Sequence, residues 1–163
     1  MAVLYTLSVF LHIVAAAFWV GGMLFLSLVV VPALRGEPER ARIIERVGIF
    51  FERAGMGALV VVLLTGLVNL GFRGVTSVGA LWSTPAGRMG VLKLLLFALV
   101  AGLSLWHNRL IGRKAVQLLR HAQNSAEGER LRRWSSWVGR IVLLISLALV
   151  LLGVFIARGV SLW

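Results

Sequence analysis

Residues 11–34, LHIVAAAFWVGGMLFLSLVVVPAL, decide the fold class of this chain. They contain no Asp, Glu, Lys or Arg, and with the residues before them they form an apolar segment from about 3 to 34. A helix needs roughly 20 mainly apolar residues to cross a bilayer. The segment lacks a basic start and exceeds the roughly 7–15 apolar residues of a signal peptide. We therefore expect a retained first transmembrane helix.

Three further segments have the length and composition of a membrane span, at about 54–72, 88–111 and 137–158. Hydrophobic residues make up 60% of the 163 residues, compared with about 45–50% in typical soluble domains. Lipid-exposed spans of this kind are helical, because a helix pairs its own backbone polar groups. The sequence predicts one all-α transmembrane domain over residues 1–163, a four-helix up-and-down bundle.

Positive charge is unevenly distributed over the predicted connections. Most of the 17 Lys and Arg residues, and all six Glu, lie in the connections that follow the first and third spans. Cytoplasmic loops of membrane proteins are enriched in Lys and Arg. The pattern predicts a multi-pass membrane protein with both termini outside the cytoplasm, N-out and C-out.

The formal net charge of +11 would indicate nucleic-acid binding in a soluble protein. Here the charges flank apolar segments, so we expect contact with anionic lipid headgroups of the bilayer and no nucleic-acid partner. Residues 37–53, EPERARIIERVGIFFER, alternate apolar and charged positions with helical spacing, which predicts an interfacial helix leading into the second span.

Local signals predict where two other helices begin and end. Thr84 followed by Pro85 is typical of a helix start, with the hydroxyl as N-cap and proline at the first position. The third span is expected to continue beyond the membrane to about residue 123. Asn124, with Glu127 three residues later, resembles a capping box for the last helix. The connection over 71–88 is expected to be a loop.

Polar side chains occur at similar depth in the outer half of the predicted bundle. Ionisable groups there cost about 2.5–3.5 kcal/mol on insertion scales and often mark function. Each also has a structural interpretation: a hydrogen bond to a neighbouring helix for the histidine, snorkelling for the lysine and interfacial anchoring for the arginines. The residues are His12, Asn69, Arg73, Arg88 and Lys93.

Helical spacing places these groups on stripes of small or polar residues that are expected to face inward. Such stripes let helices approach closely. They are His12, Ala16, Trp19 and Met23 in the first span; Gly55, Ala58, Val62, Thr65 and Asn69 in the second; and Met89, Lys93, Phe97, Val100, Ser104 and His107 in the third. In the fourth span, Ser146 and Gly153 are expected to serve packing.

The side chains available limit the possible chemistry. The chain has no Cys and no Asp, and no Glu lies within a predicted span, so we expect no catalytic residues of hydrolytic or nucleophilic type. Imidazole and thioether suit Cu(I) or haem iron. One hypothesis is a Cu(I) site made by His12 with Met89 or Met23. The alternative is haem b, with His12 as axial ligand and the cationic side chains on its propionates.

Several stretches resemble the four-helix membrane domain of the copper-resistance D (CopD) family. They are LHIVAAAFWVGG, VVVPALR, LLTGLVNL, TPAGRMGVLKLLLF and the HNR at 107–109. The resemblance implies copper uptake or handling at the inner membrane, with a periplasmic copper-binding partner. It also carries His12, Trp19 and Lys93 over as site residues. The chain lacks a His- or Met-rich outer segment, so capture of copper would need a partner protein or a homo-oligomer.

The same pattern is similar to the HemJ-type protoporphyrinogen oxidases, which are small four-helix membrane proteins associated with haem. They too have a histidine in the first helix near a Trp-x-x-Gly element and a lysine in a later helix. Here GRMGVLKL has Arg88 and Met89 where that family has a histidine-containing motif. This resemblance implies a haem-dependent membrane oxidoreductase, while a structural subunit without ligand is a third hypothesis.

Overall fold

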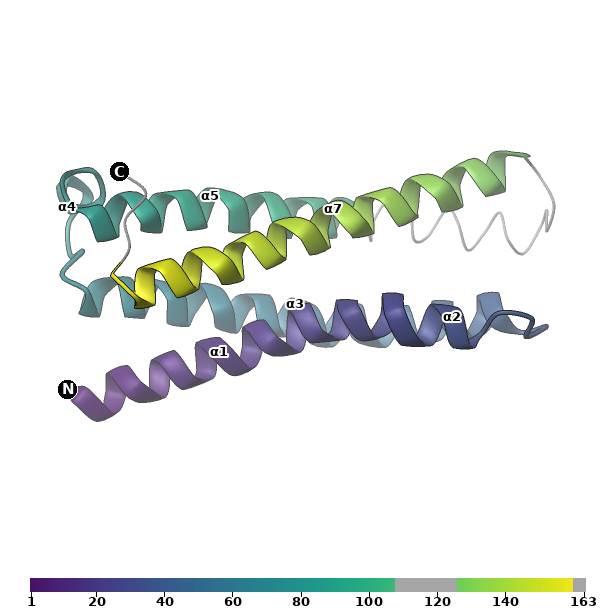
Figure 1. Ribbon diagram of the computed structural model, residues 1–163, viewed down its shortest axis with the longest axis horizontal. Helices are drawn as coiled ribbons and strands as arrows, with labels where there is room; N and C mark the ends of the chain where they lie inside the picture. The colour runs from purple at the N-terminus through teal and green to yellow at the C-terminus, as the bar shows by residue number, and fades with distance from the viewer. Residues whose placement is uncertain (108–125, 160–163) are drawn as a thin grey trace.

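The computed structural model describes residues 1–107 and 126–159, and this part of the chain is helical throughout apart from short turns (Figure 1). Its elements are α1 (Ala2–Phe25), the π-helical turn η1 (Leu26–Val30), α2 (Val31–Ala33), α3 (Arg40–Phe72), α4 (Val78–Ser83), α5 (Pro85–Trp106) and α7 (Ala126–Ala157).

Four helical stretches are long and apolar enough to cross a membrane, which confirms the predicted fold class. They are Ala2–Ala33, Arg42–Phe72, Pro85–Trp106 and Ser136–Ala157. Large apolar side chains cover the outside of the bundle: Leu64, Leu95 and Leu144, for example, are each about three-fifths exposed. Because lipid tails are the solvent that suits such a surface, the chain is a multi-pass membrane protein.

The helices run up and down (Figure 1). The first turn of α1, the short helix α4 and the last turn of α7 lie at one end of the bundle, here called the α4 end. The other end, the α2 end, carries α2 and the first turns of α3 and α7. α1 packs along α3 and α5 along α7, while α1 also contacts α7 and α3 contacts α5. α1 and α5 are therefore parallel, as the sequence predicts.

The first span widens before it ends. Pro32 has no N–H to donate to a carbonyl of the preceding turn, and in the turn before it the N–H of Val31 bonds to the carbonyl of Leu26, five residues back. This π-helical turn carries the chain into α2. Gly36 then adopts a φ of 92°, a conformation that glycine takes without steric cost.

α3 is one continuous helix of 33 residues, about 50 Å long at 1.5 Å per residue. The predicted interfacial helix over 37–53 and the predicted second span are therefore parts of one element. Proline is absent between Arg40 and Phe72, so nothing interrupts the backbone ladder. Because α3 is longer than the ~30 Å hydrocarbon core, its first turns extend past it at the α2 end.

The start of α5 confirms the predicted cap. The hydroxyl of Thr84 accepts a hydrogen bond from the N–H of Gly87 at 3.0 Å, and Pro85 takes the first helical position. The connection before it differs from the predicted loop, because Ser77 caps α4 by accepting from the N–H of Ala80. Gly87 packs against the backbone of α4 so closely that a Cβ there would clash with the carbonyl oxygen of Ala80.

Other sequence predictions lie outside the described residues. The extension of the third span to 111 and on to about 123 falls there beyond His107. The capping role of Asn124 falls there as well. α7 begins at Ala126 and contains a candidate membrane span over Ser136–Ala157, which confirms the predicted fourth span at about 137–158.

Candidate functional site

His12 lies on α1 and points to α3, where it contacts Thr65. Its Nδ1 atom is 2.9 Å from the hydroxyl oxygen of Thr65. That hydroxyl is itself 2.6 Å from the carbonyl oxygen of Val61, one turn earlier, and has only one proton to donate. Because this proton goes to the carbonyl, the Thr65 oxygen accepts from Nδ1–H of His12. The carbonyl of Val62, a second acceptor, also lies close to the ring.

This arrangement assigns the tautomer of the neutral ring. With the proton on Nδ1, the Nε2 atom of His12 carries a lone pair and no hydrogen. A histidine whose other nitrogen donates to a fixed acceptor is the usual form of a metal-binding imidazole. The ring is thus prepared to act as a ligand or as a hydrogen-bond acceptor through Nε2.

Two small features allow α1 to hold the ring against α3. Gly66 leaves room for the imidazole, since a Cβ there would lie 3.3 Å from Cε1 of His12. One turn toward the α4 end, the hydroxyl of Ser8 donates to the carbonyl of Thr65 at 3.4 Å. The interhelical contact therefore has two hydrogen bonds, only one of which involves the ring.

Lys93 lies on α5 and is half-buried against α7. A Cβ on Gly153 would sit 3.4 Å from its Nζ atom, so the absent side chain at Gly153 makes room for the ammonium. Lys93 is close enough to His12 for the two groups to interact electrostatically, and Arg73 acts on Lys93 in the same way. The imidazole and the lysine, which the sequence places at one depth, are thus within electrostatic range of each other.

The two arginines of this layer donate to main-chain carbonyls. Arg73, which follows α3, donates through a guanidinium nitrogen to the carbonyl of Ile156 near the end of α7, at 3.0 Å. Arg88 donates to the carbonyl of Trp82 at the end of α4, at 3.3 Å. Carbonyls at helix ends lack partners within their own helix. Both guanidiniums therefore hydrogen-bond to carbonyls at helix ends.

Asn69 lies one turn beyond Thr65 on the same face of α3. Its side-chain oxygen is buried and has no hydrogen-bond partner in the described part of the chain. A buried polar atom without a partner lowers stability by about 1–3 kcal/mol. Such atoms in proteins often bind a water molecule or a ligand. The amide adds a polar group without a partner at the level of the His12 ring.

The methionines differ in their relation to His12. Met89 is 2% exposed and lies on α5 one turn before Lys93. Met23 is eleven residues from His12 on the same helix, about 16 Å along its axis, and packs against the core cluster around Leu59 and Val100. The structure therefore does not bring Met23 to the imidazole, and of the two predicted thioether ligands only Met89 lies in the same layer.

Trp19 lies on α1 two turns from His12, toward the α2 end, and contacts the neighbouring helices α3 and α7. Its indole N–H donates to the hydroxyl of Ser146 on α7 at 3.2 Å. Its ring stacks against Phe51 with centroids 5.7 Å apart and packs onto Gly55, where a Cβ would lie 2.6 Å from the ring. These contacts make Trp19 part of the bundle's packing and of an interhelical hydrogen bond.

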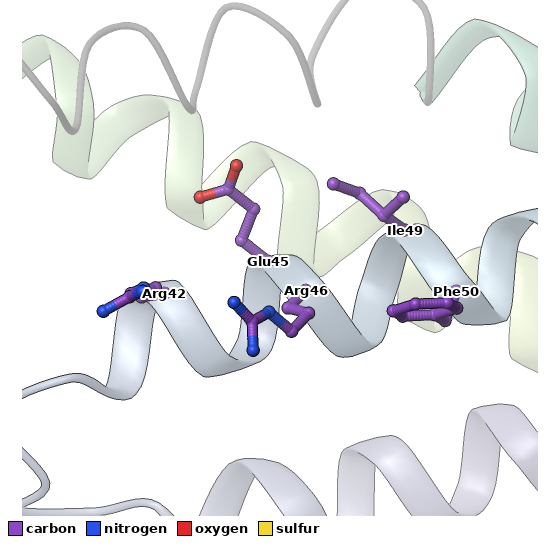
Figure 2. A pocket seen from close by; sticks show the side chains of 5 residues that line it. All are labelled: Arg42, Glu45, Arg46, Ile49 and Phe50. Atoms are coloured by element: carbon purple, nitrogen blue, oxygen red, sulfur yellow. The ribbon is translucent and has the colours of Figure 1, made fainter.

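The described residues contain no second candidate metal site, and a further polar groove among them is far from His12. Within residues 1–107 and 126–159, no three His, Asp or Glu side chains are grouped so that they could hold a metal ion. A shallow groove follows the first turns of α3 at the α2 end (Figure 2), lined by Arg42, Glu45, Arg46, Ile49 and Phe50. Arg46 is nineteen residues from Thr65, about 28 Å along α3, so the groove is separate from the His12 site.

Sequence comparison places these features in a family. The family model described as "Copper resistance protein D" (CopD) matches residues 45–156. The chain belongs to the CopD family. The matched range includes Thr65, Asn69 and Lys93 but begins after α1, so the assignment of His12 rests on the geometry described above.

A relative covers almost the whole CopD-family chain. A protein of Aquifex aeolicus (strain VF5), described only as "Uncharacterized protein", is 38% identical over 160 residues, which are 94% of this chain and 95% of the relative. No solved structure matches the chain. These comparisons do not show the predicted similarity to HemJ-type oxidases.

The interactions that sequence reasoning missed are those between helices. Thr65 was expected on an inward stripe, yet its role as acceptor for His12 depends on α1 packing against α3. Gly66, which makes room for the imidazole, carries no sequence signal that separates it from the other 17 glycines, and Gly153, expected to serve packing, carries no signal that it makes room for a lysine. Small residues near a polar group on a neighbouring span would be the pattern to search for.

Proposed function

We propose that this CopD-family protein binds copper as Cu(I) inside the membrane and takes part in its uptake or handling across the bilayer. The observation that carries the proposal is the hydrogen bond from Nδ1–H of His12 to Thr65, which leaves Nε2 with a lone pair in the bundle. Imidazole and thioether donors suit Cu(I). Met89, in the same layer, is the proposed thioether ligand.

The haem alternative is less well supported. Nε2 of His12 could also serve as an axial ligand of haem b iron. However, the propionates of a haem would need the cationic side chains of the layer, and Arg73 and Arg88 donate to the carbonyls of Ile156 and Trp82. Copper is therefore the better match to the donors in this layer.

One measurement separates the two metals. Protein purified in mild detergent under argon and loaded with Cu(I) should hold near-stoichiometric copper, counted by mass spectrometry, and show no Soret band. Cu(I) has a filled d shell, so the loaded protein should be colourless. A Soret band with matching iron in the same sample would overturn the copper proposal in favour of haem.

A conservative change at Thr65 tests the assigned tautomer. Thr65→Val keeps the shape of the side chain but removes the acceptor of Nδ1–H, so the affinity for Cu(I) should fall by about 10–100-fold, the usual effect of losing a partner of a metal-bound histidine. Chelator competition measures the affinity. Thr65→Ser keeps the hydroxyl and should bind like the unchanged protein; equal affinity in Thr65→Val would contradict the tautomer.

We further propose that the α4 end faces the periplasm of a bacterial inner membrane, where a copper-binding protein could deliver the ion, and that the chain can form a homo-oligomer. The basic residues of the α2 end then contact cytoplasmic anionic lipids. The chain has no Cys, which makes single-cysteine labelling clean. Thr76→Cys at the α4 end should react with an impermeant maleimide on intact spheroplasts.

The matched variant for the other side is Glu37→Cys. Thr76 and Glu37 are both exposed in turns between helices, so access to reagent differs only by side of the membrane. Glu37→Cys should react only after the membrane is permeabilised. Labelling of Glu37→Cys on intact spheroplasts, with Thr76→Cys protected, would reverse the orientation and move the proposed entry of copper to the cytoplasm.

A further inference from the structure

Lys93 places an amino group, which carries a positive charge when protonated, near the proposed copper site. Its Nζ atom lies against Gly153. Lys93 is also within range of electrostatic interaction with His12 and with Arg73. In the described part of the chain, the one ion pair is between Arg42 and Glu39 at the far end of the bundle. The lysine therefore has no acidic partner among the described residues.

Along α1, α3, α5 and α7, as far as the structure describes them, no Glu position lies at the level of Lys93. The chain has no Asp, and its six Glu lie in the ranges 37–52 and 127–129. On α3, Glu52 is thirteen residues from Thr65, about 20 Å along the axis. On α7, Glu129 is 24 residues from Gly153, about 36 Å along the axis. Within the described residues nothing supplies a counter-charge to Lys93, which leaves room for a bound anion.

A Cu(I) ion bound at this site also needs a negative counter-charge. The imidazole of His12 and the thioether of Met89 are neutral ligands, so a Cu(I) ion held by them keeps its full positive charge. A protonated Lys93 and a Cu(I) ion carry like charges, which repel each other strongly in a low-dielectric interior. A copper ion bound by neutral ligands alone would therefore be repelled by Lys93.

We propose that copper is bound together with a small soft anion, a halide or a thiolate, which ligates Cu(I) and lies against the ammonium of Lys93. This inference rests on the proposed copper site at His12. The anion completes the coordination of Cu(I), neutralises its charge and supplies the counter-charge of the lysine. Asn69, whose amide has an unpartnered buried oxygen at this level, can turn its N–H groups toward the anion, because the two ends of an amide exchange by rotation.

The test compares anions at fixed free copper. Protein in nanodiscs under argon is titrated with chelator-buffered Cu(I) in sodium sulfate, and then with added sodium bromide or a small monothiol. The affinity of the unchanged protein should rise on the order of tenfold with at least one of the two anions. The arm that responds identifies the anion as halide or thiolate.

Variants show whether the anion acts through Lys93. Lys93→Leu removes the charge and adds no donor atom for Cu(I), and its copper affinity should be the same in sulfate, bromide and monothiol. Lys93→Arg keeps the charge and should keep the dependence on the anion. His12→Ala should bind no copper in any of these solutions.

A spectroscopic measurement on the unchanged protein does not depend on how a variant folds. Copper K-edge absorption fine structure, compared with the sample in sulfate, should show an added bromide neighbour in bromide or an added sulfur neighbour in monothiol, beyond the imidazole nitrogen and the Met89 thioether that are present in every solution. If copper binds through His12 with equal affinity in all solutions and without such a neighbour, the anion is overturned while the copper site stands. If His12→Ala keeps its copper, the proposed function fails as well.

Discussion

Replacing His12 with Ala should abolish copper binding and leave the bundle folded. The variant removes the nitrogen ligand on which the proposed site depends, whereas its structural cost is small. Interhelical hydrogen bonds in a membrane contribute about 0.6 kcal/mol on average, and typical net stabilities are about 5–15 kcal/mol. Copper per chain, measured by mass spectrometry after Cu(I) loading, should fall from near-stoichiometric to background, while far-ultraviolet circular dichroism stays helical.

Ser8→Ala is the matched control for this variant. It removes the neighbouring hydrogen bond between α1 and α3, from the Ser8 hydroxyl to the carbonyl of Thr65, but does not touch the imidazole. A copper content equal to that of the unchanged protein is expected. If Ser8→Ala and His12→Ala lose copper alike, the interhelical contact matters and Nε2 does not; copper retained in His12→Ala moves the ligand elsewhere.

The bundle was predictable because its signals are local along the chain. Twenty or so apolar residues make a span whatever its neighbours are, and Thr84 caps α5 through a nearby N–H. The short helix α4 was missed because its six residues are too few for a hydrophobic period, with Ser77 as the only start signal. The continuity of α3 was missed because a change from charged to apolar composition looks like a boundary although the backbone has none.

The sequence predicts the depth of the candidate site residues in the membrane but not the contacts between them. Counting residues from a span's end puts His12 and Lys93 at one level, since every helical residue rises by the same ~1.5 Å. Which faces meet depends on how helices pack, and the sequence carries no direct record of that. Met23 shows the limit: it shares the face of His12, yet three turns separate them. For Arg73 and Arg88 the sequence allows both anchoring and propionate binding, and their carbonyl partners depend on how α7 and α4 pack.

Trp19→Ala should destabilise the bundle by about 3 kcal/mol, the low end of the range for removing a large buried aromatic side chain. Trp19 is 7% exposed, stacks on Phe51 and fills the space above Gly55, so its removal leaves a cavity between α1 and α3. The low end applies because the unfolded helices remain in lipid, where burial of apolar surface gains little. Titration with a denaturing detergent, followed by circular dichroism, measures the loss.

Trp19→Phe separates packing from hydrogen bonding. It keeps a ring against Phe51 and Gly55 but loses the indole N–H, which leaves the hydroxyl of Ser146, 3% exposed, without that donor. The expected cost is about 0.6 kcal/mol for the interhelical hydrogen bond, several times less than for Trp19→Ala, because most of the side chain's contribution comes from its contact area. Equal losses in the two variants would instead make the bond to Ser146 the dominant interaction. Since Trp19 lies seven residues from His12, about 10 Å along α1, copper affinity should be unchanged in Trp19→Phe, which distinguishes a packing residue from a ligand-binding one.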